Sequence, residues 1–396
     1  MRTGKVILSS LILSFVWVVT AVGIAQAQAE KLNVVYAGFA FLGEHADIAS
    51  DYKYSQQVYS IKASNGRPVV EHKLAEMLLQ TENSSMNIIT DRLGQLDGEE
   101  SVALAVALDW EDVTVEKIEE GLIKSVYNLH GQVLLFSFAS MEIVGCYPFG
   151  VRVTDSTPEY PSEEHKIEIF KKLYLDAVGD VNFLKSLSEL VNEVKVDRND
   201  SNLTFKVEEI VLEPKAQQFL EKNFPDQREQ AFKIFVAQQF SSFFAKNLKL
   251  SILPYTKGKA IGNKMAGRFA NGDVFELQIP EGDYPVTITI RGFKKAKLDE
   301  NATGQSWAYG SYIHLGIQSA LGDVVNTRIK NAAVKIVPAG QNDVADRSAF
   351  VESLLALFDK TTKQVVSCDS KWFKKCADGA ATKEQFITLK DKIAKY

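Results

Sequence analysis

Two stretches of this chain repeat one order of strand-like and helix-like segments, and this order limits the possible folds more than any single motif does. Each stretch opens with a strand rich in β-branched and aromatic residues, at residues 32–41 and 203–212. A long helix, further strands, a hairpin and a closing helix follow in both. We therefore predict an α/β (α+β) fold with two similar modules, each a mixed sheet with a long helix, a hairpin and a closing helix, and we interpret the repeat as an internal duplication.

The spacing of apolar residues predicts the helices. The strongest helical face runs from about residue 227 to residue 245, and we interpret it as core packing and not as a partner-binding ridge. Its apolar residues are Phe232, Val236, Phe240, Phe243 and Phe244. Residues 129–138 and 143–153 form a predicted hairpin. Pro148 lies in its second arm and cannot donate a ladder hydrogen bond, which predicts that this arm lies at a sheet edge.

The first 29 residues resemble a secretory signal peptide. Arg2 and Lys5 precede an apolar run at residues 6–24, and the alternating alanines of residues 25–29 offer small-x-small cleavage sites. The alternative is a membrane anchor, which the short run and its polar residues disfavour. We predict a periplasmic or secreted protein with no transmembrane span after cleavage.

This division predicts a signal peptide at 1–29, a first module at 30–180, a second module at 200–360 and a C-terminal tail at 361–396. In an oxidising compartment, the close pair Cys368 and Cys376 predicts a disulfide loop in that tail. Cys146 lies in an apolar strand-like stretch and is expected to be a buried, inert thiol. A formal net charge of −5 disfavours broad binding of nucleic acid.

The segment at 257–272 combines glycines with cations, and it is the predicted ligand site. Glycines let backbone amides approach a ligand, and cations attract an anion. The candidate anion-binding residues are Lys257, Lys259, Asn263, Lys264 and Arg268. The spacing is wrong for a phosphate-binding Walker loop, because three residues and not four separate Gly258 from Gly262. The alternative interpretation is a solvated surface loop.

No catalytic, metal or cofactor motif is present in the sequence. The five histidines are scattered, without the i, i+4 spacing of a helical zinc site, and no Gly-x-Ser-x-Gly motif occurs. The acidic residues between Asp109 and Glu120 are interpreted as a solvated face. We therefore assign no catalytic residue, no metal site and no cofactor, and we expect a binding protein more than an enzyme.

The order of elements resembles the periplasmic α/β module of the curli secretion channel subunit. The TolB amino-terminal domain and the periplasmic lipoprotein activators of peptidoglycan synthases are similar. This resemblance implies a non-enzymatic part of the Gram-negative envelope, although the chain lacks a lipid-bearing cysteine after its leader. It supplies no binding residues.

We therefore predict an exported, non-enzymatic binding or scaffold protein of the cell envelope. Its partner is an envelope protein or an anionic ligand. The alternative is an exported hydrolase whose site is assembled between the two modules. A pocket that gathers carboxylates with His130 or His314 would favour that alternative.

Overall fold

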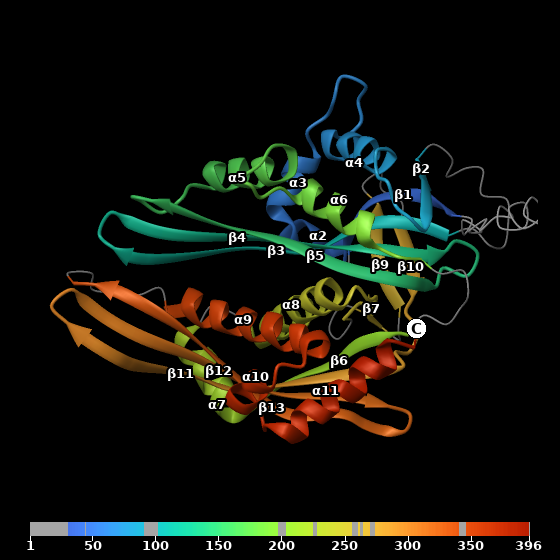
Figure 1. Cartoon of the computed structure of the whole chain (residues 1–396). Helices are drawn as coiled ribbons and strands as arrows, with labels where there is room; N and C mark the ends of the chain where they lie inside the picture. The colour runs from blue at the N-terminus through green and yellow to red at the C-terminus, as the bar shows by residue number, and fades with distance from the viewer. Residues whose placement is uncertain are drawn as a thin grey trace, which may run out of the picture.

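The computed structural model describes residues 31–43, 45–90, 102–196, 203–224, 228–255, 260–261, 264–269, 274–339 and 346–395. The described strands form two sheets, which lie one above the other in Figure 1. The predicted α/β fold with two similar modules is confirmed. Among the described helices, none is long and apolar enough to cross a membrane.

The first module comprises the strands and helices that precede residue 197. Its strands are β1 (Leu32–Leu42), β2 (Met86–Ile89), β3 (Val102–Glu119), β4 (Leu122–Ser137) and β5 (Ile143–Thr157). Its helices are α2 (His45–Asp51), α3 (Lys53–Tyr59), α4 (Val69–Leu79), α5 (Glu163–Leu175) and α6 (Phe183–Glu193). Strand β1 runs parallel to β2 and β3, and β3, β4 and β5 form an antiparallel meander.

The second module begins at β6 and ends with helix α11. Its strands are β6 (Phe205–Leu212), β7 (Ile252–Leu253), β11 (Tyr284–Asn301), β12 (Gly304–Ser319) and β13 (Gly322–Pro338). Its helices are α7 (Pro214–Asn223), α8 (Glu229–Leu248), α9 (Asp346–Ser367), α10 (Ser370–Cys376) and α11 (Ala380–Ile393). Strand β6 runs parallel to β7 and β11, and β11, β12 and β13 form an antiparallel meander.

The two sheets therefore share one strand order, β2-β1-β3-β4-β5 in the first and β7-β6-β11-β12-β13 in the second. They also share their irregularities, because each β-bulge in one meander has a counterpart on the matching strand of the other. The extra residues at equivalent positions of the two modules are Ala37 and Glu208, Asp109 and Arg291, Ile118 and Leu298, and Val144 and Val324. A bulge re-aims the side chains around it, so the matching bulges give the two sheets the same local twist.

The molecule is built in layers. Helices α3, α4, α5 and α6 cover one face of the first sheet, and the apolar side chains between them form one core. Helices α8 and α9 lie between the two sheets, where their apolar residues pack on the second sheet. The opposite side of this helix layer covers the second face of the first sheet. The phenylalanine face predicted at 227–245 belongs to this core: Phe232, Phe240 and Phe244 are buried, as predicted.

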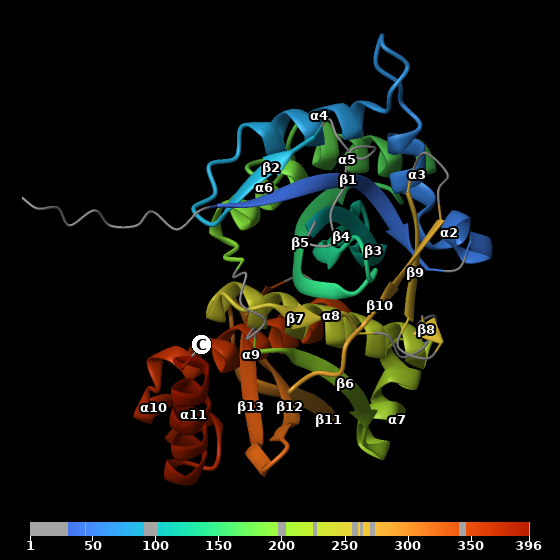
Figure 2. The same cartoon turned by 90° about the vertical axis from the view of Figure 1, so that its right-hand side faces the viewer.

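A crossing segment from the second half completes the first sheet. It comprises β8 (Ala260–Ile261), β9 (Lys264–Phe269) and β10 (Val274–Gln278), and β9 pairs with Ala40–Leu42 at the end of β1 (Figure 2). Strands β10 and β11 are consecutive in the chain but belong to different sheets, so residues 279–283 carry the chain from one sheet to the other.

The predicted disulfide between Cys368 and Cys376 is not formed in this structure, and the cysteines are free. Helix α10 occupies most of the interval between them. A seven-residue helix rises about 10 Å, beyond the roughly 4.4–6.8 Å between Cα atoms that a disulfide spans. The sequence between the cysteines was expected to form a loop, and the structure shows a helix there instead. Cys146 is buried, as predicted, and burial raises the pKa of its thiol well above the usual value.

Glu111 fastens helix α3 to the first sheet. Its carboxylate accepts hydrogen bonds from the backbone N–H groups of Tyr54 and Ser55 at 2.8 and 2.9 Å. Burial raises the pKa of this carboxyl group, while the bonds from Ser55 and Tyr54 act in the opposite direction. The acidic segment at 109–120 is therefore not the solvated face that we expected, since Asp109 and Glu111 are both buried.

The raised pKa of Glu111 makes stability depend on pH. Over a range of pH, the native state holds the Glu111 proton while the unfolded state has lost it. The contribution of this group to the unfolding free energy is therefore complete below pH 4.5 and is lost as the pH rises through the native pKa. We expect Glu111→Gln to flatten the decline of the unfolding free energy above pH 4.5, by at most about 1.4 kcal/mol per pH unit. Urea unfolding at several pH values measures this. Glu168→Gln, at an exposed position of α5, serves as the control, and equal slopes in both variants would contradict the assignment.

The free cysteines give a second prediction. A thiol reagent applied to the native protein should modify Cys368 and Cys376, which are partly exposed, while Cys146 reacts only after unfolding because it is buried. Mass spectrometry of the labelled peptides identifies each site. Detection of a single reactive thiol in denaturant would instead show that the pair is oxidised.

Candidate functional site

The residues predicted to bind an anion lie mostly outside the described part of the structure. Lys257, Lys259 and Asn263 are not among the described residues. Lys264 and Arg268 lie on β9, whose backbone pairs with β10 and β1. The structure therefore leaves the predicted anion site as a prediction.

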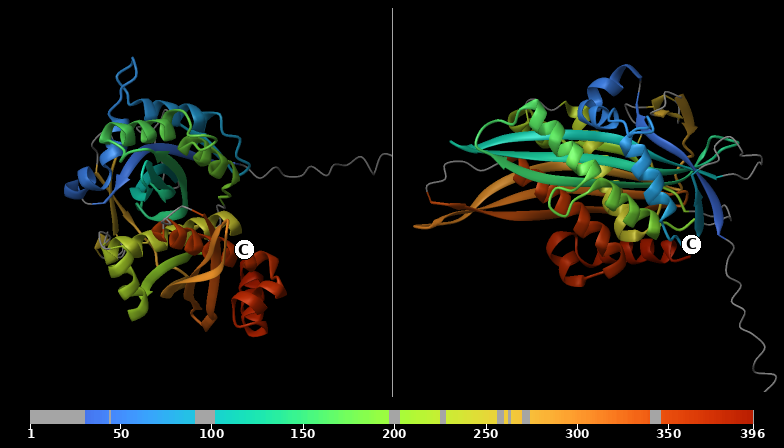
Figure 3. Two further views of the ribbon diagram at one scale, coloured as in Figure 1. Left: turned by 90° about the vertical axis from the view of Figure 1, so that its left-hand side faces the viewer. Right: turned by 90° about the horizontal axis from the view of Figure 1, so that it is seen from above.

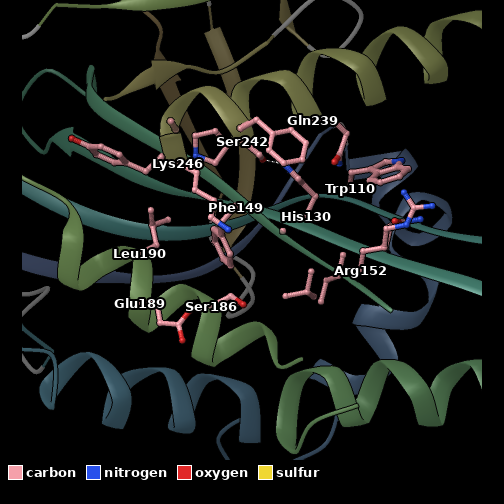
Figure 4. A pocket seen from close by; sticks show the side chains of 18 of the residues that line it. Trp110, His130, Phe149, Arg152, Ser186, Glu189, Leu190, Gln239, Ser242 and Lys246 are labelled. Atoms are coloured by element: carbon pink, nitrogen blue, oxygen red, sulfur yellow. Dashed lines mark hydrogen bonds between the residues drawn. The ribbon is translucent and has the colours of Figure 1, made fainter. Parts of the chain in front are cut away.

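The described residues form a different site, a cleft of about 380 Å³ at the free edge of the first sheet (Figure 4). Strand β5 ends the strand order of this sheet, which confirms the edge position predicted from Pro148. Helix α6 of the first module packs on one side of β5, and helix α8 of the second module packs on the other side. The cleft opens between these two helices.

Each wall of the cleft is one face of an element. Helix α6 contributes residues at i, i+3, i+4 and i+7, and so does helix α8. These residues are Ser186, Glu189, Leu190 and Glu193 on α6, and Gln239, Ser242, Phe243 and Lys246 on α8. Residues 147–152 of β5 form the floor, and Trp110 and His130 close the inner end. The cleft is therefore apolar in its body and charged at the exposed ends of the two helices.

A hydrogen-bonded series of three side chains crosses from the first module to the second at this inner end. His130 lies between the other two: its Nδ1 is 2.6 Å from Oδ1 of Asp109, and its Nε2 is 2.6 Å from Oγ of Ser242. Both His130 and Asp109 are buried, and Ser242 is partly exposed on the cleft wall. We refer to Asp109, His130 and Ser242 as the relay.

The folding of the first sheet places the first two members of the relay. Asp109 is the extra residue of the β3 bulge, between the pairs Leu108–Gly131 and Trp110–His130, so it lies beside His130. Alternation along β4 then puts Asn128, His130 and Gln132 on the face that meets α8. Successive side chains of a strand point to opposite faces of the sheet. These three polar side chains therefore face α8, while the residues between them face the apolar core.

The relay is held by further hydrogen bonds. The side-chain amide of Gln132 donates to Oδ2 of Asp109 at 2.5 Å, and the thiol of Cys146 donates to Oε1 of Gln132 at 3.2 Å. A carboxylate only accepts hydrogen bonds, so Nδ1 of His130 carries the proton toward Asp109. In the neutral ring, Nε2 then accepts from the hydroxyl of Ser242. This assignment follows from the hydrogen-bond network.

Gly150 makes room for the imidazole. A Cβ atom at this position would lie 2.9 Å from Cδ2 of His130 and 3.2 Å from the carbonyl oxygen of Leu129. Both approaches are shorter than ordinary van der Waals contact. The absence of a side chain at Gly150 therefore allows His130 to lie flat against β5 and reach Ser242.

A second polar cluster joins the modules farther along the same interface. Glu116 of β3 accepts hydrogen bonds from the backbone N–H and the hydroxyl of Ser348, near the start of α9. Burial raises the pKa of the neighbouring Asp112, and Thr114 and Arg347 act against that rise. Among the described residues, no group of three or more His, Cys, Asp or Glu side chains is arranged to hold a metal ion.

Sequence reasoning did not identify this site. It named His130, with His314, only as a condition for the hydrolase alternative, and it did not single out Asp109 or Ser242. One local signal was available, since the polar residues Asn128, His130 and Gln132 alternate with Leu129 and other non-polar residues in a strand. His314, in contrast, lies in the second module, where its Nε2 is 2.6 Å from Oδ1 of Asn326 on the neighbouring strand.

Comparisons with known proteins establish no family for this chain. No protein-family model matches the sequence, and no curated protein matches it significantly. Among solved structures, a minor lipoprotein from Acinetobacter baumannii matches with 8% identity and a TM-score of 0.19, over 41% of this chain and 87% of its own. A DUF330 protein from Xanthomonas campestris matches with 13% identity and a TM-score of 0.19, over 44% of this chain and 89% of its own. These are weak neighbours, and scores this low carry no argument about function.

The role of Gly150 can be tested by adding one methyl group. Gly150→Ala should lower the unfolding free energy by about 1–3 kcal/mol, because the new Cβ must displace His130 or the strand. Gly316→Ala on β12 is the matched control, since its Cβ would meet no atom closer than 3.8 Å, and we expect a change within about 0.5 kcal/mol. Chemical denaturation measures both. Equal effects would mean that Gly150 gives the imidazole no special room.

Proposed function

We propose that this protein is an exported, envelope-associated binding protein whose ligand occupies the cleft between the two modules. The observation that carries the proposal is the cleft itself. Its volume of about 380 Å³ is in the range of small-molecule sites, and its lining combines apolar surface with polar and charged groups that could orient a ligand. Both modules contribute to its walls, so a bound ligand would contact both.

The lining favours an amphipathic ligand with an acidic group. Tyr147, Phe149 and Leu190 offer apolar surface for a hydrocarbon portion. At the mouth, Lys249 forms an ion pair with Glu193. Lys246 is exposed and makes no ion pair with another described residue, which leaves its charge for a ligand. An anionic group at Lys246 would agree with the anionic ligand predicted from the sequence, at a different place from the 257–272 segment.

The export part of the proposal is supported by the leader at residues 1–29, which lies outside the described residues. The segment at 257–272 stays a proposed second contact for an anionic partner. We also infer that the two modules arose by internal duplication. The shared strand order and the matching positions of the bulges support this inference, because bulges tend to be retained within families.

Binding in the cleft can be tested with a fluorescent anionic amphiphile, dansyl-undecanoic acid. Ser186→Trp places a large side chain on the cleft wall, and we expect it to weaken binding at least about tenfold in a fluorescence titration. Lys246→Met should weaken binding by about three- to tenfold through loss of its charge.

Lys185→Trp is the matched control, because Lys185 is exposed on the same helix and does not line the cleft. Wild-type affinity in that variant is the expected result. Unchanged affinity in Ser186→Trp would place the probe elsewhere and contradict the proposal.

A further inference from the structure

We propose that Ser242 is a nucleophile toward carboxylic esters that enter the cleft, with His130 as its general base. This inference goes beyond ligand binding and rests on the geometry of the relay. Two 2.6 Å contacts join Asp109, His130 and Ser242 in the order carboxylate, imidazole, hydroxyl. This is the arrangement by which unrelated serine hydrolases activate a hydroxyl group, and it is recognised by geometry and not by sequence position.

The surroundings hold the imidazole in the orientation that the chemistry needs. Asp109 accepts the Nδ1 proton with one carboxylate oxygen, and Gln132 binds the other. The side-chain amide of Gln238 lies 3.4 Å from the backbone carbonyl oxygen of Asp109. Asp109 therefore acts as a positioning residue, and His130 and Ser242 are the groups that would touch the substrate.

Ser242 also lies where a substrate can reach it. Ser242 and His130 both line the cleft, and Figure 4 shows them facing each other at its inner end. Apolar side chains extend from this point toward the mouth, with Phe149 and Leu190 among them. An ester with a medium-length apolar acyl chain fits this apolar part of the lining.

The developing oxyanion needs hydrogen-bond donors, and the edge strand supplies one. In an antiparallel pair, backbone N–H groups alternate between the partner strand and the opposite edge. The N–H of Cys146 points to the free edge, because it donates to Ser251 Oγ at 2.9 Å. Pro148 and Gly150 lie two and four residues after Cys146 on β5, so their backbones face the same edge as that of Cys146. The N–H of Gly150 therefore points to the free edge beside His130, on the cleft floor.

Two side chains of α8 are further candidate donors. Ser242 lies inside the helix, so its own N–H is committed to the helical ladder. Gln239 and Lys246 lie three residues before it and four residues after it, on the same face, and both line the cleft. Their amide and ammonium groups can approach the same carbonyl oxygen.

The reaction is ester hydrolysis in two balanced steps. Oγ of Ser242 attacks the carbonyl carbon while its proton passes to Nε2 of His130, and the tetrahedral intermediate collapses as that proton goes to the departing alkoxide. An alcohol leaves and Ser242 is acylated. Water then attacks the acyl group and gives a proton to His130, which returns it to Oγ as the bond to Ser242 breaks. One ester and one water yield one carboxylic acid and one alcohol.

An alkyl fluorophosphonate tests the proposal directly on the mature protein. We expect the probe to attach to Ser242, located by peptide mass spectrometry, and p-nitrophenyl butyrate to be hydrolysed. Ser242→Ala should abolish both, and His130→Gln should slow both at least about 1,000-fold. Asp109→Asn should lower kcat at least about 100-fold with KM changed less than about threefold. Circular dichroism measures the folded fraction and corrects kcat, because unfolding alone would lower the apparent kcat without changing KM.

Ser241→Ala is the matched control. Ser241 is the preceding residue on α8 and is buried, and its hydroxyl has no hydrogen-bond partner among the described residues. Labelling and hydrolysis should stay at wild-type rates in this variant. If Ser242→Ala does not fold, Ser242→Cys replaces it: the thiol is close in size, should lose fluorophosphonate labelling and should gain alkylation by iodoacetamide.

Two results would overturn the proposal. One is a folded wild-type protein that is not labelled at Ser242 after prolonged exposure. The other is ester hydrolysis that persists unchanged in Ser242→Ala. Either result leaves the binding function standing if dansyl-undecanoic acid still binds in the cleft, because the titration and the labelling measure different properties.

Discussion

Burial of both faces of the first sheet is the constraint on which the rest of the structure depends. Strand β4 is buried along nearly its whole length, because α3–α6 cover one face and the layer of α8 and α9 covers the other. A polar side chain on a face that is covered in this way must find a hydrogen-bond partner or destabilise the fold. Asn128, His130 and Gln132 lie on that face, and each has a partner. The relay is one place where this requirement joins the two modules.

The sequence predicted the plan of the fold well because the plan rests on periodic apolar residues. The helical face expected at about 227–245 lies in α8, and its Phe232, Phe240 and Phe244 are buried. The extents of the strands were predicted less well. Strand β3 continues to Glu119, although hydrophobicity alone would end the strand at the polar residues that begin with Asp109. Those polar residues contact other layers, and contacts of that kind leave no local pattern.

The candidate site could not be derived from the sequence, for a physical reason. Ser242 lies 112 residues from His130, and only the packing of α8 on the first sheet brings them together. The bulge that turns Asp109 toward His130 also has no sequence signature. The equivalent bulge of the second module has Arg291 in the position of Asp109, so the residue type does not mark the bulge. The matching position of His130 there is Tyr312. The two modules thus share a backbone plan, while the relay belongs to the first module and the helix packed against it.

The crossing segment has a consequence for how the chain reaches its native state. Residues 40–42 of β1 pair with a strand that is made more than two hundred residues later. A ribosome or an export channel delivers the amino terminus first, so that stretch of strand edge stays open until the second half has emerged. Unpaired edges recruit other strands. That edge is therefore open to wrong pairing during this interval, and cutting the chain between the two halves would leave the first sheet unfinished.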